Sequence, residues 1–306
     1  MKALVTGGGG FVGSHLAARL ALDGWEVVTA VRPEASPWRL AALGVAGDVT
    51  IVPADLVDPA TTAAVTREAA PDVAFLLAAA RSRATPAERA ATAAVNATSG
   101  AWLVDALPER CRGVVRLGSS TEYARTPGPM DETTPLRPRG FFGATKAAGS
   151  LLVAAAAVER GVRATVLRAF QVYGPLDHPH RLVPRALRAA RTGEVLPLTT
   201  VGLRRDWVFV SDVVEACVRA ALADELPTGQ VLNIGTGRQV ANDELVDEVR
   251  RVTGRPVAVA EGACAPREWD TGSWVCDPSL ARQLLGWEAK VALDEGLARC
   301  WQAERG

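Results

Sequence analysis

The sequence has little that would tie the chain to nucleic acid or to a membrane. Its 34 basic and 34 acidic side chains cancel to a net charge of zero, and no basic run stands out. This balance argues against nucleic acid or an anionic lipid surface as the main partner. No apolar stretch reaches the ~18–20 residues of a membrane span, so we expect no membrane association.

Cysteine is also scarce and scattered. The five cysteines form no CxxC pair, and an odd number fits reduced thiols better than a disulfide framework or a metal site. The first residues predict a strand rather than a charged segment followed by an apolar one. We therefore expect no secretion signal, no metal and a cytoplasmic location.

What the chain does have is an alternation of short β-branched segments with longer helical ones. Its 306 residues, 48% of them hydrophobic, suffice for a substantial core. The alternation is typical of a parallel sheet with crossover helices, an α/β class. We expect strands over residues 2–6, 26–31, 49–52, 73–77, 114–117 and 163–168. We expect helices over residues 11–23, 59–69, 86–106 and 142–160.

The pattern changes near Gly174-Pro175, after which the segments are shorter and punctuated by proline. Expected helices at 211–223, 242–253 and 278–285 outnumber strands there. We therefore expect residues 1–174 to form a dinucleotide-binding domain and residues 175–306 mainly a smaller substrate-binding lobe, with some segments returning to the sheet. A ligand would lie at the carboxyl ends of the strands.

A glycine-rich turn, TGGGGFVG, joins the first expected strand to the first helix. Gly7 permits the tight turn, Gly10 permits close approach of a pyrophosphate, and Gly13 permits helix packing on the strand. The N–H groups at Phe11 and Val12 and the positive end of the helix dipole then face the phosphates. The sequence predicts a Rossmann-type, doubly wound dinucleotide-binding sheet.

The end of the second strand predicts which dinucleotide binds. A carboxylate there would accept the ribose hydroxyls of NAD(H), but Val31 ends the strand and Arg32 follows. Because a guanidinium suits a 2′-phosphate, we favour NADP(H) over NAD(H). Asp55 is expected to bond the adenine amino group, or else to cap the helix that begins at residue 59. Further cofactor contacts are expected from Leu56, Ala78 and Ala79.

Seven motifs occur in order along essentially the whole chain: TGGGGFVG, GSSTEYA, FGATKAAGS, LRAFQVYGP, RRDWVFVSDVVEA, NIGTG and DPSLARQLLGW. Together they resemble the extended short-chain dehydrogenase/reductase superfamily, which includes NAD(P)-dependent epimerases, dehydratases and reductases of nucleotide-linked sugars. The resemblance implies a Rossmann fold with a C-terminal substrate lobe and a nucleotide-diphosphate sugar as partner. It also implies a homodimer, formed through the helices at 86–106 and 142–160.

The resemblance further implies a catalytic tyrosine, with a lysine four residues later on the same helix face. The tyrosine exchanges a proton with the sugar oxygen, and a strand-end hydroxyl assists. Here the lysine is Lys146, which binds the nicotinamide ribose, and the tyrosine position holds Phe142. The assisting hydroxyl is assigned to Ser119, with Ser120 as the alternative.

Three explanations of Phe142 stay open. The chain is an engineered variant in which tyrosine has been replaced; or the natural enzyme uses another acid; or the protein binds its ligands without catalysis. The candidate acids are Tyr123, Glu122, His178 and His180.

Substrate contacts are also implied by the resemblance. Arg205 and Arg267 match two arginines that bind a nucleotide diphosphate, and paired guanidinium groups would neutralise a pyrophosphate. Gln171 stands where relatives usually have asparagine. His178 and His180 lie in a proline-containing loop and are further candidates for sugar contact.

The main interpretation is an NADP(H)-dependent reductase of a nucleotide-linked 4-keto-6-deoxysugar, in deoxysugar or antibiotic biosynthesis. One alternative is a C4 epimerase, whose relatives usually carry an acid where Val31 stands. A 4,6-dehydratase is disfavoured because Ser120 and Thr121 occupy the positions of its acidic pair, and Glu122 lies one place later. A catalytically silent binding protein is the alternative from another class.

Overall fold

The computed structural model of the chain describes residues 1–81, 84–265 and 271–304. The chain divides into two compact units, each built from three segments. The first unit contains Met1–Ala124, Pro135–Arg168 and Val214–Leu232. The second contains Arg125–Thr134, Ala169–Val213 and Asn233–Gly306. The boundary at Gly174 stays a prediction of the sequence.

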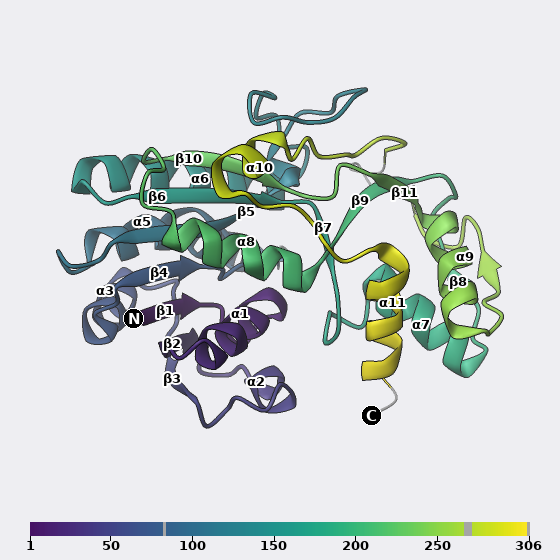
Figure 1. Ribbon diagram of the computed structural model, residues 1–306, viewed down its shortest axis with the longest axis horizontal. Coiled ribbons are helices and arrows are strands. Elements are labelled where there is room, and N and C mark those ends of the chain that lie inside the picture. Colours follow the sequence, from purple (N-terminus) through teal and green to yellow (C-terminus); the bar gives the residue numbers. More distant parts are fainter. Residues whose placement is uncertain (82–83, 266–270, 305–306) are drawn as a thin grey trace. The chain divides into compact units, whose positions relative to one another are not determined.

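Among the described residues, seven strands form one sheet in the order β10-β6-β5-β4-β1-β2-β3 (Figure 1). The strands are β1 (Lys2–Thr6), β2 (Glu26–Val31), β3 (Val49–Pro53), β4 (Val73–Leu76), β5 (Gly113–Ser119), β6 (Ala164–Ala169) and β10 (Gln230–Ile234). β1 pairs in parallel with β2 and β4, and β2–β3 and β4–β5 are parallel too. The doubly wound α/β class expected from the sequence is confirmed.

The central strands are largely apolar and mostly buried because helices cover both faces of the sheet. α3 (Pro59–Ala69), α5 (Ser99–Asp105) and α6 (Phe141–Arg160) pack beside one another on one face. α1 (Phe11–Leu22) and α8 (Val210–Leu222) lie together in front of the sheet in Figure 1. An ion pair of 3.0 Å between Arg19 and Glu215 joins these last two helices.

Two elements of this unit differ from the sequence expectation. The single helix expected over residues 86–106 is α4 (Pro86–Ala93), a π-helical turn η1 (Ala94–Thr98) and then α5. Thr98 and Ser99 donate their hydroxyl protons to the carbonyls four residues earlier, a pattern that favours bending. A short helix α2 (Trp38–Ala42) follows β2, where the sequence pattern predicts no element.

The second unit carries smaller sheets. β7 (Gln171–Tyr173), β9 (Arg204–Phe209) and β11 (Gln239–Ala241) form one, and β8 (Leu196–Pro197) pairs with β12 (Val259–Ala260). Its helices are α7 (Leu182–Thr192), α9 (Asn242–Thr253), α10 (Ser279–Leu285) and α11 (Leu293–Ala303). α9 packs against both α7 and α11.

In the described part of the chain, α6 alone has the length and apolar composition of a membrane-spanning helix. The sequence expectation that no stretch qualifies is therefore wrong for this helix. Half of its most apolar window is buried within the fold, which is what a core helix beside a sheet requires.

Candidate active site

The glycine-rich turn between β1 and α1 has two positions where a side chain would collide with backbone. Gly7 has a φ of +73°, and a Cβ there would lie 2.8 Å from the backbone of Ala78. A Cβ on Gly13 would lie 2.2 Å from the carbonyl oxygen of Gly7, so the helix packs directly on the turn. The resulting bare backbone surface fits a dinucleotide pyrophosphate.

The N-terminus of α1 offers the groups that a phosphate needs. Gly10 is the N-cap residue, and no side chain in the described part of the chain caps the helix. The N–H of Gly10 donates to the Gly7 carbonyl at 2.8 Å, which fixes the turn. Phe11, Val12 and Gly13 form the first helical turn, whose N–H groups and dipole favour an anion.

Asp55 follows β3 and is exposed. Its Oδ1 accepts the N–H of Val57 at 3.1 Å. The N-cap of α3 is Asp58, whose carboxylate accepts the N–H of Thr61 at 2.7 Å. The interpretation of Asp55 as the helix cap is therefore wrong, and its carboxylate keeps acceptor capacity for another group.

The remaining expected cofactor contacts lie near the glycine turn or after neighbouring strands. The N–H of Ala78 donates to the hydroxyl of Thr6 at 3.3 Å, which joins the ends of β4 and β1. Leu56 is buried, and Ala79 is exposed. Ala78 borders the glycine turn, since a Cβ on Gly7 would lie 2.8 Å from its backbone, and the contacts of Leu56 and Ala79 with a cofactor stay predictions.

Two arginines follow β2, and the sequence pattern points only to the first of them. Arg32 is exposed. Arg39, on α2, is buried; its Nη1 donates to the Gly9 carbonyl at 3.4 Å, and its guanidinium lies 4.5 Å from the Trp38 ring. The signal that was missed is the arginine in PWRL, because a helix of five residues has no readable periodicity.

Ser119 ends β5 and starts a 3-10 turn, η2 (Ser120–Glu122). Its hydroxyl lies 2.8 Å from that of Thr121 and accepts the N–H of the same residue at 3.2 Å. The Ser119 N–H donates to Glu122 Oε1 at 2.8 Å, and Ser120 is buried. The strand end therefore presents a pair of coupled hydroxyl groups rather than a lone serine.

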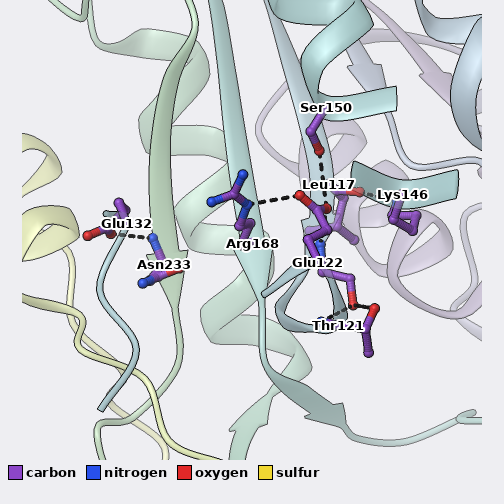
Figure 2. Close-up of polar contacts among 9 residues, drawn as sticks. Leu117, Thr121, Glu122, Glu132, Lys146, Ser150, Arg168 and Asn233 are labelled. Carbon is purple, nitrogen blue, oxygen red and sulfur yellow. Dashed lines mark hydrogen bonds and ion pairs between the residues drawn. The ribbon is translucent and has the colours of Figure 1, made fainter. Parts of the chain in front are cut away.

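Glu122 is fully buried, and its carboxylate holds three elements together (Figure 2). Oε2 accepts Arg168 Nε of β6 at 2.9 Å, and Oε1 accepts the Ser150 hydroxyl of α6 at 3.1 Å. Burial opposes the Arg168 charge, but Glu122 and Tyr123 outweigh it and raise the pKa of Arg168. Glu122 thus joins β5, β6 and α6 through hydrogen bonds and an ion pair.

Phe142 and Lys146 stand one turn apart near the start of α6, and the helix begins against η2. A Cβ on Gly143 would lie 2.4 Å from the Thr121 carbonyl oxygen, so this glycine permits the close approach. The Arg81 guanidinium lies 4.0 Å from the Phe142 ring. Lys146 is buried, and its Nζ donates to the Leu117 carbonyl two residues before Ser119 (Figure 2).

The surroundings of Lys146 disfavour its charge. Burial is the largest cause, the Arg116 and Arg81 cations add to it, and Glu122 opposes it; together they lower the pKa of Lys146 to about 7. A lysine amine with this pKa is populated in both protonation states near neutral pH, as a group that takes and returns a proton requires.

The expected substrate residues that are described belong to the second unit. Gln171 begins β7, and Arg205 lies on β9, where Nη1 donates to the carbonyls of Arg204 at 2.6 Å and Thr271 at 3.2 Å. Arg267 lies outside the described residues.

The histidine pair of this unit lies in the loop between β7 and α7. The rings of His178 and His180 are 5.5 Å apart, and both side chains are exposed. The preceding Leu176 has a φ of +63°, a strained value for a residue other than glycine.

Comparison with known proteins extends over nearly the whole chain. A family model described as the NAD dependent epimerase/dehydratase family matches residues 3–235. UDP-glucose 4-epimerase of Mycolicibacterium smegmatis is 32% identical over 312 residues, which cover 98% of this chain and 97% of the other. dTDP-glucose 4,6-dehydratase of Xanthomonas campestris pv. campestris is 30% identical over 321 residues, which cover 96% of this chain and 90% of the other. Among solved structures, MoeE5 in complex with UDP-glucose and NAD has a TM-score of 0.86 and 30% identity. The match covers 100% of this chain and 99% of the MoeE5 chain.

Proposed function

Because the chain belongs to the NAD-dependent epimerase/dehydratase family, we propose that it epimerises a nucleotide-diphosphate hexose at C4 with a retained nicotinamide cofactor. Membership makes the chain an NAD-dependent enzyme of the oxidoreductase/epimerase type, in agreement with its resemblance to extended short-chain dehydrogenases. The observation that carries the epimerase proposal is the corner where α6 meets η2. There Gly143 brings the start of α6, and with it Lys146, against the turn that follows Ser119.

The groups of this corner and the glycine turn before α1 each have a part in the proposed reaction. A nicotinamide cofactor held there would supply hydride acceptance from C4 and hydride return to the opposite face of the sugar. The bare backbone at Gly7 and Gly13 and the N-terminus of α1 bind the cofactor phosphates. The coupled hydroxyls of Ser119 and Thr121 orient the sugar oxygen.

We assign to Lys146 the proton exchange that a tyrosine would otherwise carry out. Side chains one turn apart lie on the same helix face. The Lys146 amine can therefore act at the site where Phe142 supplies no phenol. Tyr123 is 1% exposed, with the Arg168 guanidinium 4.6 Å from its ring, and Glu122 is bonded to Arg168. Neither of these two candidate acids is available to a sugar.

A dehydratase is the less favoured member of the family. Its acidic pair would stand at Ser120, which is buried, and at Thr121, whose hydroxyl bonds that of Ser119. The carboxylate one place later, Glu122, is 0% exposed. The described turn thus lacks an accessible acid for eliminating water.

The proposal is tested with UDP-glucose and NAD as the first probes, since the similar proteins are named for or bound to them. We expect formation of the C4 epimer by the unmodified chain, detected by chromatography. Lys146→Met should abolish it and Ser119→Ala should slow it, with cofactor binding followed separately. Failure with UDP-, dTDP- and other nucleotide hexoses alike, while cofactor binds, would rule the epimerase out.

A second candidate function is reduction of a 4-keto-sugar by NADPH. The residues that follow β2 favour it. That strand ends without a carboxylate, and Arg32 and Arg39 follow it. We expect NADP to bind more tightly than NAD, and Arg39→Ala or Arg32→Ala to remove the difference. Equal affinities in the unmodified chain would count against this candidate.

A further inference from the structure

Arg116 is a buried cation on β5 that none of the family motifs predicted. Its side chain is 2% exposed and lies in the core beneath α5 and α6. A Cβ on Gly149 would lie 2.1 Å from its Nη2, and one on Gly100 would lie 3.2 Å from its Nη1. The guanidinium therefore occupies space that two glycines on two helices leave open.

The guanidinium fixes the π-helical turn η1. Nη2 of Arg116 donates to the carbonyl of Asn96 at 2.5 Å. The side chain of Asn96 in turn joins two elements of the site by hydrogen bonds. Its Oδ1 accepts the N–H of Ala80 at 2.8 Å, and its Nδ2 donates to the Ala80 carbonyl at 2.9 Å and to the Thr145 hydroxyl at 3.0 Å. Arg116 thus holds the loop after β4 and the residue next to Lys146 in one arrangement.

The positive charge of Arg116 is poorly compensated. Among the described residues its Nε has no hydrogen-bond partner. Burial lowers the pKa of Arg116 to about 10, and Glu122 opposes this only in part, since its carboxylate bonds Arg168 and Ser150. A guanidinium with this pKa stays charged at neutral pH.

We propose that Arg116 is a positioning residue for Lys146: it fixes the turn through which Asn96 joins the Ala80 loop to α6, and its positive charge opposes that of the Lys146 amine. The proposal deepens the proposed function and rests on it for the part that Lys146 plays in proton exchange. The charged groups that act on Lys146 are Arg116 on β5, Glu122 on η2 and Arg81 after β4. Of these, Arg116 is the buried cation.

The lysine content of the chain makes a direct test practical. Only Lys2, Lys146 and Lys290 occur, so a protein labelled with ¹³C at lysine Cε gives three signals. Lys146→Met assigns the signal of interest, and the other two are internal references. Titration of the whole protein by NMR then follows the amine without any need for substrate.

Three substitutions separate charge from hydrogen bonding. Arg116→Gln keeps an N–H donor for the Asn96 carbonyl but removes the charge, and should raise the titration midpoint of Lys146 by about one pH unit. Arg116→Lys adds a fourth signal, whose own titration shows where residue 116 is charged, and the Lys146 midpoint should stay in place as long as that signal shows a charged amine. Arg116→Met removes both, should raise the midpoint and should also weaken NAD binding severalfold. Arg163→Met, which removes an arginine bonded to the Ala221 carbonyl, is the matched control.

The outcomes distinguish this proposal from the proposed function. An unchanged midpoint in folded Arg116→Gln overturns the action of Arg116 on Lys146, whatever the enzyme turns over. If Arg116→Gln does not fold, Arg116→Lys decides, because a midpoint that rises while the signal of residue 116 shows a charged amine also contradicts the proposal. A raised midpoint with no epimerase activity in the unmodified chain supports Arg116 and rejects the proposed function.

Discussion

One hydroxyl separates this chain from the catalytic residues that its resemblance implies. Phe142 keeps the ring of the implied tyrosine, and the Arg81 guanidinium lies 4.0 Å from it. Such a cation–π contact is worth about 0.5–1 kcal/mol at an exposed site. It retains the ring geometry of the corner without restoring a proton, so the proton transfer has to come from another side chain.

Restoring the phenol should therefore add to the proton transfer that we assign to Lys146. We expect Phe142→Tyr to raise turnover of the productive nucleotide sugar by ~10²–10⁴, the usual contribution of one proton-transfer group. Phe141→Tyr is the matched control, because its ring lies beside Arg89, at 5.9 Å, and one position away on the helix. Steady-state kinetics of both variants decide the point. No gain in Phe142→Tyr would mean that the tyrosine role does not transfer to position 142.

At the scale of the secondary-structure elements, the function of the turn before α1 depends on glycines at positions where a side chain would collide with backbone. Gly13→Ala would put a Cβ 2.2 Å from the Gly7 carbonyl oxygen, so helix and turn must separate. We expect at least a tenfold loss of NAD affinity by calorimetry. Gly47→Ala, at a glycine with no heavy atom within 4 Å of the added Cβ, should bind NAD as before. Equal affinities in the two variants would exclude the turn as the cofactor site.

Whether the sequence predicted a feature depended on how far apart in the chain its interacting residues lie. The glycine turn was readable because it is a local pattern between a strand and a helix, and the gap at Phe142 because the family resemblance implies a tyrosine four residues before Lys146. The Glu122–Arg168 pair was not, since 46 residues separate its partners and only the fold brings them together. η1 was missed because its alanine-rich segment has continuous helical character, and the partner that fixes its carbonyl, Arg116, lies on another element.

For the whole molecule, the sequence predicts a homodimer through the segments 86–106 and 142–160. α6 exposes Leu151, Leu152 and Val158, which are 60%, 40% and 64% accessible. A dimer would cover this apolar surface. We expect Leu151→Arg to produce a monomer in size-exclusion chromatography with light scattering, while Leu22→Arg, at a 79% exposed leucine on α1, stays dimeric. A monomeric unmodified chain would contradict the prediction.

The pH dependence of turnover tests most directly whether Lys146 exchanges the proton. Oxidation at C4 requires the neutral amine, because it must accept the hydroxyl proton, and burial with two nearby cations lowers the pKa of Lys146 to about 7. We therefore expect kcat/KM for the nucleotide sugar to rise with pH through about 7 and then to level off, and Lys146→Met to lose this turnover. A profile that is flat between pH 6 and 8, or full activity in Lys146→Met, would contradict the assignment of proton exchange to this lysine.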